Sequence, residues 1–287
     1  MNSTRADADE HDRGKKDFKE EWPSRTVLRW RAIQRLAQWH FWSGRLPLYL
    51  VTEFPKSGAT WYSKMLSECI DVPFPPQADP PRWKTMILRS THLYSPRFRN
   101  VTVVMRDGRD IMVSAYYHFL FSNEANLDFA VHQKREFLDF ADYDDIRTNM
   151  PAFIDYMFET FPREGWSTRF SWAGFVDSWI DQDVPIVRYE DLLSDPEAQL
   201  KRVSLALIGQ APDEADLKRI VEKYSFKVLT GRKSGEEKAN AFLRKGIAGD
   251  WRNVFSREAA EKFNRHAGAQ LIELGYEPDE RWVASVD

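Results

Sequence analysis

Short apolar runs alternate with longer segments of helical periodicity along most of the chain. The runs at residues 48–54, 85–91, 100–105 and 184–188 are largely continuous, as expected for strands buried on both faces. Between and after them, apolar residues recur at helical intervals, and these segments predict the helices 61–69, 107–119, 171–181, 194–209, 213–223 and 256–274. Strands that alternate with helices predict an α/β fold of three layers, with a central parallel sheet flanked by helices.

The pattern divides the chain into a charged tail and one folded domain. Residues 1–21 have almost no apolar side chains and predict a disordered tail, whereas residues 22–287 are expected to form a single domain. Within it, residues 22–44 predict an amphipathic helix rich in arginine and tryptophan. That helix fits either packing on the domain or peripheral contact with an anionic membrane. The pattern between residues 122 and 172 does not resolve the topology.

The charge, cysteine content and apolar stretches of the chain argue against several classes of function. A net charge of −3 argues against a nucleic-acid partner, since such partners are bound through an overall positive charge. One cysteine, Cys69, excludes an intramolecular disulfide framework and a cysteine-based metal pattern, and no metal site is expected. No apolar stretch reaches the length of a signal or membrane-spanning segment, so the expected location is cytoplasmic.

The first strand runs directly into a turn suited to anions. Lys56, Gly58 and Thr60 follow it and precede a helix, whose free N-terminal amides and dipole favour a phosphate or sulfate group. Gly58 permits close approach of the backbone to oxygens. The single glycine does not satisfy the nucleoside-triphosphatase pattern GxxxxGK[ST], so this loop by itself leaves the chemistry open.

Five motifs taken together are more specific. In order they are PKSGATW at 55–61, Thr91-His92, RDGRDIMVSAYYHF at 106–119, RYEDL at 188–192 and FLRKGIAGDW at 242–251. Between about residues 46 and 275 the chain resembles the cytosolic sulfotransferase family. The resemblance implies a P-loop-like fold and transfer of a sulfonate group from 3′-phosphoadenosine 5′-phosphosulfate (PAPS) to a hydroxyl or amine, without a metal. The acceptor remains a small molecule, a lipid or a glycan.

The resemblance also implies roles for particular residues. The residues expected to bind PAPS are Lys56, Ser57, Gly58, Ala59, Thr60, Trp61, Arg106, Ser114, Tyr189, Phe226, Arg244, Lys245 and Gly246. Among them, the loop residues 56–60 hold the 5′-phosphosulfate, and Arg106 with Ser114 meets the 3′-phosphate beneath a lid formed by 244–246. The catalytic residues are His92, the base that deprotonates the acceptor, and Lys56, the cation for the leaving oxygen.

Three departures from the family pattern are visible. Ala59 stands where a threonine is usual, and Ser90 stands where a lysine commonly contacts the sulfonate, with Arg89 adjacent. A KTVE-like dimerisation pattern is lacking before residue 244, so the oligomeric state is open. Two other functions therefore stay in view: a nucleotide kinase that uses the same loop, and a non-catalytic protein that binds adenosine bisphosphate.

Overall fold

A parallel four-stranded sheet forms the centre of the protein. The computed structural model describes residues 25–42, 47–76, 79, 84–122, 131, 134–164, 168–239, 241 and 243–287, so the predicted tail at 1–21 lies outside the described residues. The strands are β1 (Leu48–Glu53), β2 (Met86–Ser90), β3 (Val101–Met105) and β4 (Ile186–Arg188), in the order β2-β1-β3-β4. All three neighbouring pairs are parallel, which confirms the predicted sheet.

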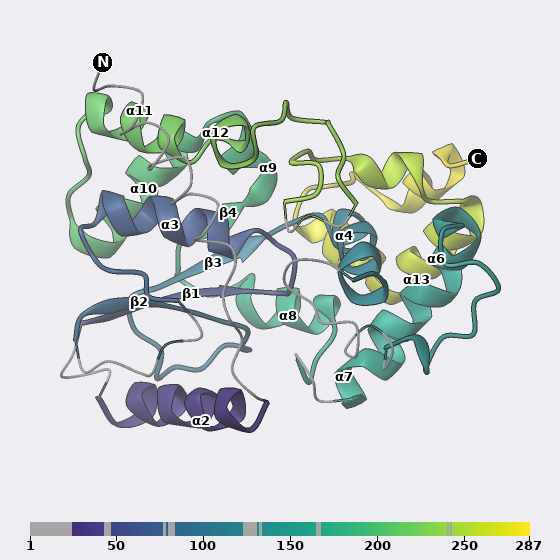
Figure 1. Ribbon diagram of the computed structural model, residues 1–287, viewed down its shortest axis with the longest axis horizontal. Helices are drawn as coiled ribbons and strands as arrows, with labels where there is room; N and C mark the ends of the chain where they lie inside the picture. The colour runs from purple at the N-terminus through teal and green to yellow at the C-terminus, as the bar shows by residue number, and fades with distance from the viewer. Residues whose placement is uncertain are drawn as a thin grey trace, which may run out of the picture.

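Helices cover both faces of the sheet, as predicted. Adjacent residues of β3 point to opposite layers: Val103 belongs to one apolar cluster and Val104 to the other. The cluster around Val104 includes residues of α3 (Ala59–Cys69), α10 (Pro196–Ile208) and α11 (Glu214–Lys223). The cluster around Val103 includes residues of α4 (Gly108–Leu120), α8 (Trp172–Trp179) and α13 (Arg257–Glu273). Figure 1 shows α3, α10 and α11 on one side of the strands and α8 on the other.

Shorter helices complete the structure. The segment whose topology the pattern left open contains α6 (Ile146–Asp155), a π-helical turn (Tyr156–Thr160) and α7 (Phe161–Glu164). These elements gather with α4 and α13 at one end of the sheet (Figure 1). The other short elements are α9 (Tyr189–Ser194), α12 (Phe226–Thr230) and the 3-10 turns Asp250–Asn253 and Glu280–Ser285. The sequence pattern missed α9 and α12 because five or six residues are too few to show periodicity.

The start of α4 is held by a buried ion pair. Asp107 caps the helix by accepting the backbone N–H of Arg109 at 2.9 Å, and its carboxylate also lies 2.7 Å from that guanidinium. Arg109 is 1% exposed, pairs with Glu277 at 2.5 Å and stacks on Trp251 at 3.8 Å. This arginine therefore ties α4 to the C-terminal segment.

The N-terminal helix α2 (Arg25–Trp42) is present within the predicted range 22–44. Residues 22–24 and 43–44 of that range lie outside the described residues. Among the described helices, none has both the length and the hydropathy that crossing a bilayer requires.

Candidate active site

The sheet order creates a switch point at the end of β1. The strands β1 and β3 are neighbours, but the chain continues from β1 to β2 on one side and from β3 to β4 on the other. The connections that follow β1 and β3 therefore leave the sheet in opposite directions. Such crevices at the carboxyl ends of parallel strands are where open α/β folds bind ligands. The loop after β1 is tightly curved at this point, with Lys56 at φ 76° and Gly58 at φ 95°.

A cavity of about 880 Å³ lies at this switch point. It brings together thirteen of the fourteen residues predicted for the site: Lys56, Gly58, Ala59, Thr60, Trp61, His92, Arg106, Ser114, Tyr189, Phe226, Arg244, Lys245 and Gly246. The lining contains seven arginine and lysine side chains and one carboxylate, although the whole chain carries a net charge of −3. The cavity is therefore a local cationic site in a slightly acidic protein.

Lys56 has an altered acidity in this setting. Burial lowers the pKa of its ammonium group, and Glu53 opposes that effect, while the charges of Arg106, Arg89 and Arg244 add to it. The resulting pKa is about 8. At neutral pH Lys56 is still mostly protonated, and an incoming anion would stabilise that charge.

Two of the loop amides are already engaged within the protein. The N–H of Ala59 donates to Glu53 Oε2 at 2.9 Å, and the N–H of Ser57 donates to the Phe54 carbonyl at 3.2 Å. The Ser57 hydroxyl donates to the same carbonyl at 2.8 Å, and Ser57 is absent from the cavity lining. The loop predicted to hold the 5′-phosphosulfate therefore keeps only part of its amides open to an anion.

Glu53 is a site residue that the sequence reasoning missed. It is 2% exposed, lines the cavity, and accepts Arg89 Nη1 at 2.5 Å with its other carboxylate oxygen. Arg89 also lines the cavity, two positions before Thr91 on the β2 side. A charged residue inside an otherwise apolar strand was the available signal, because a buried carboxylate needs a partner.

Arg106 connects three segments of the cavity wall. Its guanidinium donates to the Lys56 carbonyl at 3.1 Å and to the Ile247 carbonyl at 3.3 Å. The same group lies 4.3 Å from the centre of the Tyr189 ring. Ser114, two turns into α4, lines the same cavity, as the spacing of eight residues predicted.

Aromatic rings pack against the two glycines of the site. Tyr189 contacts Trp61 edge-on at 6.1 Å, and a Cβ placed on Gly58 would lie 2.8 Å from the Tyr189 ring. A Cβ on Gly246, at φ 65°, would lie 2.4 Å from the ring of Phe226. Both positions therefore require glycine for close packing as well as for backbone conformation.

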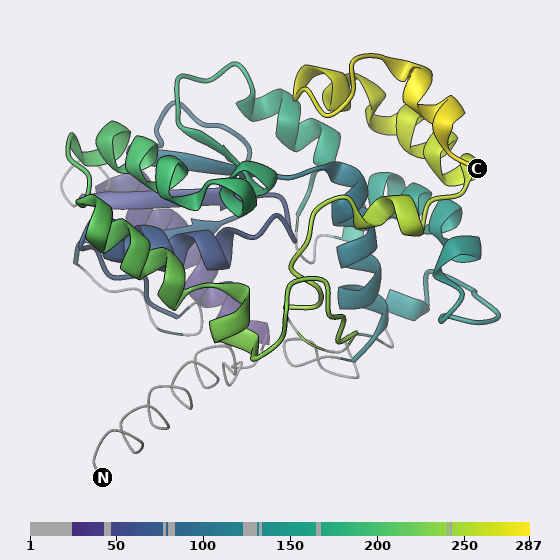
Figure 2. The same cartoon turned by 90° about the horizontal axis from the view of Figure 1, so that it is seen from above.

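The segment with Arg244 and Lys245 folds over the cavity and is anchored by carboxylates. Figure 2 shows its described part running from α12 past α4. Asp250 accepts Arg244 at 2.5 Å and Lys245 at 2.6 Å. Burial raises the pKa of Asp250, but the hydrogen bonds from these two cations outweigh it and lower the pKa to about 2. Asp110 on α4 holds the same segment by accepting the N–H of Gly249 at 2.6 Å.

His92 follows β2 and is fixed through its backbone. Its carbonyl accepts the Trp179 indole N–H at 2.8 Å, and burial lowers the pKa of its imidazole, which is therefore neutral at pH 7. His118 also lines the cavity, although the family resemblance gave it no role. Burial and the charges of Lys56 and Arg89 hold the pKa of His118 well below its usual value.

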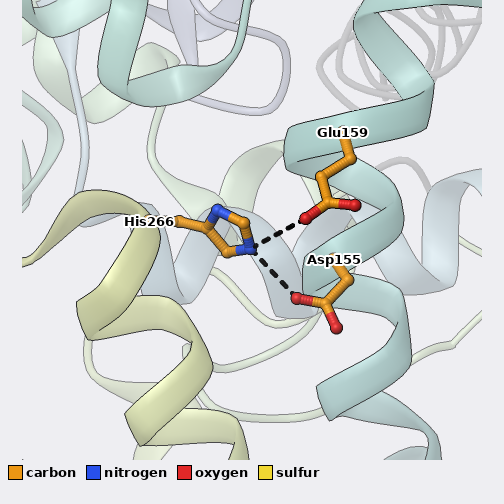
Figure 3. Close-up of side chains that lie close together, drawn as sticks. All are labelled: Asp155, Glu159 and His266. Atoms are coloured by element: carbon orange, nitrogen blue, oxygen red, sulfur yellow. Dashed lines mark hydrogen bonds and ion pairs between the residues drawn. The ribbon is translucent and has the colours of Figure 1, made fainter.

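A second cluster of titratable groups lies between the π-helical turn and α13, away from the cavity lining (Figure 3). His266 Nε2 lies 3.0 Å from Asp155 Oδ1 and 3.9 Å from Glu159 Oε1. Lys262 occupies the other Asp155 oxygen at 2.7 Å, and the imidazole stacks on Phe158 at 4.7 Å. These groups are close enough to hold a cation, but their contacts form an ion-pair network that joins the two helices.

Comparison with known proteins places the chain among sulfotransferases. Human sulfotransferase 1C2 is 26% identical, over 83% of this chain and 88% of its own length. Among solved structures, mouse sulfotransferase SULT7A1 complexed with PAP shares 18% identity and a TM-score of 0.54 over 83% of this chain and 87% of its own. Retinol dehydratase complexed with retinol and PAP shares 16% identity and a TM-score of 0.53 over 78% of this chain and 81% of its own. These structures show a shared fold.

The family model described as "Sulfotransferase domain" matches residues 85–275. The loop at 54–61 precedes that range, so its place in the site rests on the geometry of the cavity. Four of the five motifs, from Thr91-His92 to FLRKGIAGDW, fall inside it. Because this match spans well over half of the chain, the protein belongs to the sulfotransferase family.

Proposed function

We propose that this protein transfers a sulfonate group from PAPS to the hydroxyl of an acceptor held beside His92. The observation that carries the proposal is the convergence, around one cavity, of separate groups for each part of the reaction. Lys56 and the curved loop suit a 5′-phosphosulfate, while Arg106, Ser114 and the 244–246 segment suit a second phosphate. The solved relatives named above are complexes with PAP, the adenosine 3′,5′-bisphosphate that remains when PAPS loses its sulfonate. This supports the same nucleotide for this chain.

The cavity residues fit the nucleotide on structural grounds. Gly58 and Gly246 are packed so closely against Tyr189 and Phe226 that a side chain at either position would intrude. These rings and Trp61 offer aromatic surfaces for a purine base. Lys56 would balance the 5′-phosphosulfate, and Arg106 with the 244–246 segment would balance the 3′-phosphate, which ATP lacks.

The transfer step needs a base, a cation and positioning. The neutral imidazole of His92 takes the proton of the acceptor hydroxyl, whose oxygen then forms a new bond to sulfur. The bond from sulfur to the bridging oxygen breaks, and its electron pair stays on the 5′-phosphate that leaves. The ammonium of Lys56 stabilises the charge that develops on that oxygen. The donor supplies the sulfonate, and the protein supplies orientation and charge neutralisation.

Apolar side chains in the lining favour an acceptor with an apolar or aromatic body. They include Leu88 on β2, Phe119 on α4 and Leu243 beside the lid cations. Arg89, held by Glu53, adds a cation on the same side as His92. We propose that Arg89 supplies the contact to the sulfonate that Ser90 does not provide.

Two measurements test the function. Calorimetry should show that adenosine 3′,5′-bisphosphate binds at least about tenfold more tightly than ATP, because only the bisphosphate fills both anion sites. An assay with PAPS and a panel of phenols and alcohols should show sulfated product without added Mg²⁺.

A kinase would instead prefer ATP and require Mg²⁺, and a non-catalytic binding protein would bind the bisphosphate without transferring sulfonate to any acceptor. Either result contradicts the proposal. Lys56→Ala should reduce turnover by about 10²- to 10³-fold, the usual cost of removing one stabilising group from a transition state.

A further inference from the structure

Helix α2 presents an exposed apolar face that the site chemistry does not use. Trp30, Ile33 and Phe41 are 60%, 57% and 72% exposed, and Val27 is 37% exposed. At 100° per residue these four side chains fall within an arc of about 120° on one side of the helix. Single exposed apolar residues are ordinary, but four on one helix face form an exposed patch of the kind that marks an interaction site.

The side of α2 next to this arc packs on the protein. Gln38 is 2% exposed, and Arg35 donates to the Asp79 carbonyl at 2.9 Å. The helix lies at the margin of the molecule beside β2, and no described helix or strand lies beyond its outer side (Figure 1). Trp30, Ile33 and Phe41 are therefore exposed while the helix stays attached.

The charge of α2 indicates the kind of partner. The helix contains Arg25, Arg29, Arg31 and Arg35 and no acidic residue. Basic helices with tryptophan and phenylalanine on one side lie in the interface of anionic membranes, where apolar insertion and attraction to lipid headgroups add together. A two-fold contact between copies of α2 would instead set the positive charge of one helix against that of the other.

The exposed face is continuous with the catalytic cavity. Ile33 belongs to both, and its neighbours Ala32 and Arg35 also line the cavity. A membrane contacted by α2 would therefore lie next to the cavity that His92 lines.

We propose that α2 docks the protein on an anionic lipid surface. The positive charge of the helix attracts the headgroups, and Trp30, Ile33 and Phe41 enter the boundary with the acyl chains. If the sulfotransferase function proposed above holds, the acceptors reached in this way are amphiphiles that carry a hydroxyl and partition into membranes. The docking itself does not depend on catalysis.

Co-sedimentation of the full chain with vesicles tests this proposal without donor or acceptor. The protein should sediment with vesicles that contain phosphatidylserine and much less with pure phosphatidylcholine, and high salt should weaken the association. The double substitution Trp30→Glu with Phe41→Glu should reduce the bound fraction by about tenfold or more, because both aromatic anchors are lost. Leu205→Glu is the matched control, since Leu205 is 47% exposed on α10, and it should bind like the unaltered protein.

Calorimetry with adenosine 3′,5′-bisphosphate checks that the double variant keeps its folded cavity. Three results would overturn the proposal: no sedimentation of the unaltered protein with anionic vesicles, equal sedimentation of the double variant, or a dimer in light scattering that the double substitution dissociates. Failure of sulfonate transfer with intact vesicle binding would contradict the proposed function and leave the docking surface standing.

Discussion

The two sides of the cavity are built differently. In the proposed function, the donor side consists of the loop after β1, Arg106 after β3 and the 244–246 segment, and its groups are joined by hydrogen bonds such as the one from Arg106 to the Lys56 carbonyl. The acceptor side consists of the end of β2, apolar side chains of α4 and residues of α2. A rigid, cationic donor side suits one invariant nucleotide, whereas an apolar acceptor side can change its specificity by exchanging side chains without disturbing the donor site.

Substitution of His92 is expected to have the largest effect and to separate the two sides. His92→Ala should lower kcat by about 10²- to 10⁴-fold, since the acceptor hydroxyl loses its base. Affinity for adenosine 3′,5′-bisphosphate, measured by calorimetry, should stay the same because the donor side is intact. His266→Gln, outside the cavity lining, is the control and should keep its activity. Normal turnover of the His92→Ala variant would contradict the assignment of His92 as the base.

Substitution of Gly58 addresses the donor side alone. In Gly58→Ala the new methyl group meets the Tyr189 ring at 2.8 Å and the backbone is strained at φ 95°. Strain of about 1 to 3 kcal/mol should weaken bisphosphate binding roughly 5- to 150-fold, as measured by calorimetry.

Gly209→Ala is its matched control. Gly209 has φ 73° but no atom within 4 Å of the added Cβ, so the control has the backbone strain without the contact at the site. It should lower the melting temperature and leave bisphosphate affinity unchanged. Equal binding by both variants would show that the close packing of Gly58 on Tyr189 is not needed for the donor.

The pH profile of kcat/KM should have an alkaline limb set by Lys56 on the donor side and an acid limb set by His92 on the acceptor side. On each limb kcat/KM should change by about tenfold per pH unit. The pKa of Lys56 is lowered to about 8, so kcat/KM should fall as the pH rises above that value and the ammonium loses its proton. The pKa of His92 is also lowered, so the acid limb should lie below the usual range for histidine, where the base becomes protonated. Lys56→Arg should remove the alkaline limb while the acid limb remains, because arginine stays charged. An unchanged alkaline limb in that variant would assign it to another group.

Much of the donor side could be predicted because its residues follow strands directly. Lys56, Gly58 and Arg106 come within a few positions of a strand end, and parallel strands place such positions at one edge of the sheet. The motif order supplied the chemistry, and the cavity brings those residues together.

The sequence did not indicate how the side chains of the site pair with one another. Ser57 belongs to the motif, yet its hydroxyl bonds to Phe54, which is a matter of local turn geometry that the motif does not encode. The Glu53–Arg89 pair requires β1 beside β2, and the anchoring of Arg244 requires Asp250 to fold back toward it. His118 lines the cavity because of the orientation of α4, which its sequence periodicity leaves undetermined.

By itself, the sequence determined the α/β class, the position of the anion loop and the family, since strand burial, turn chemistry and motif order are properties of neighbouring residues. Only the tertiary structure decided which amides of that loop remain available, which carboxylates hold the cations, and that α2 exposes an apolar face next to the cavity. These features depend on which side chains and amides meet in the folded chain, whether they are a few residues apart or many, and packing selects among contacts that the local sequence allows equally.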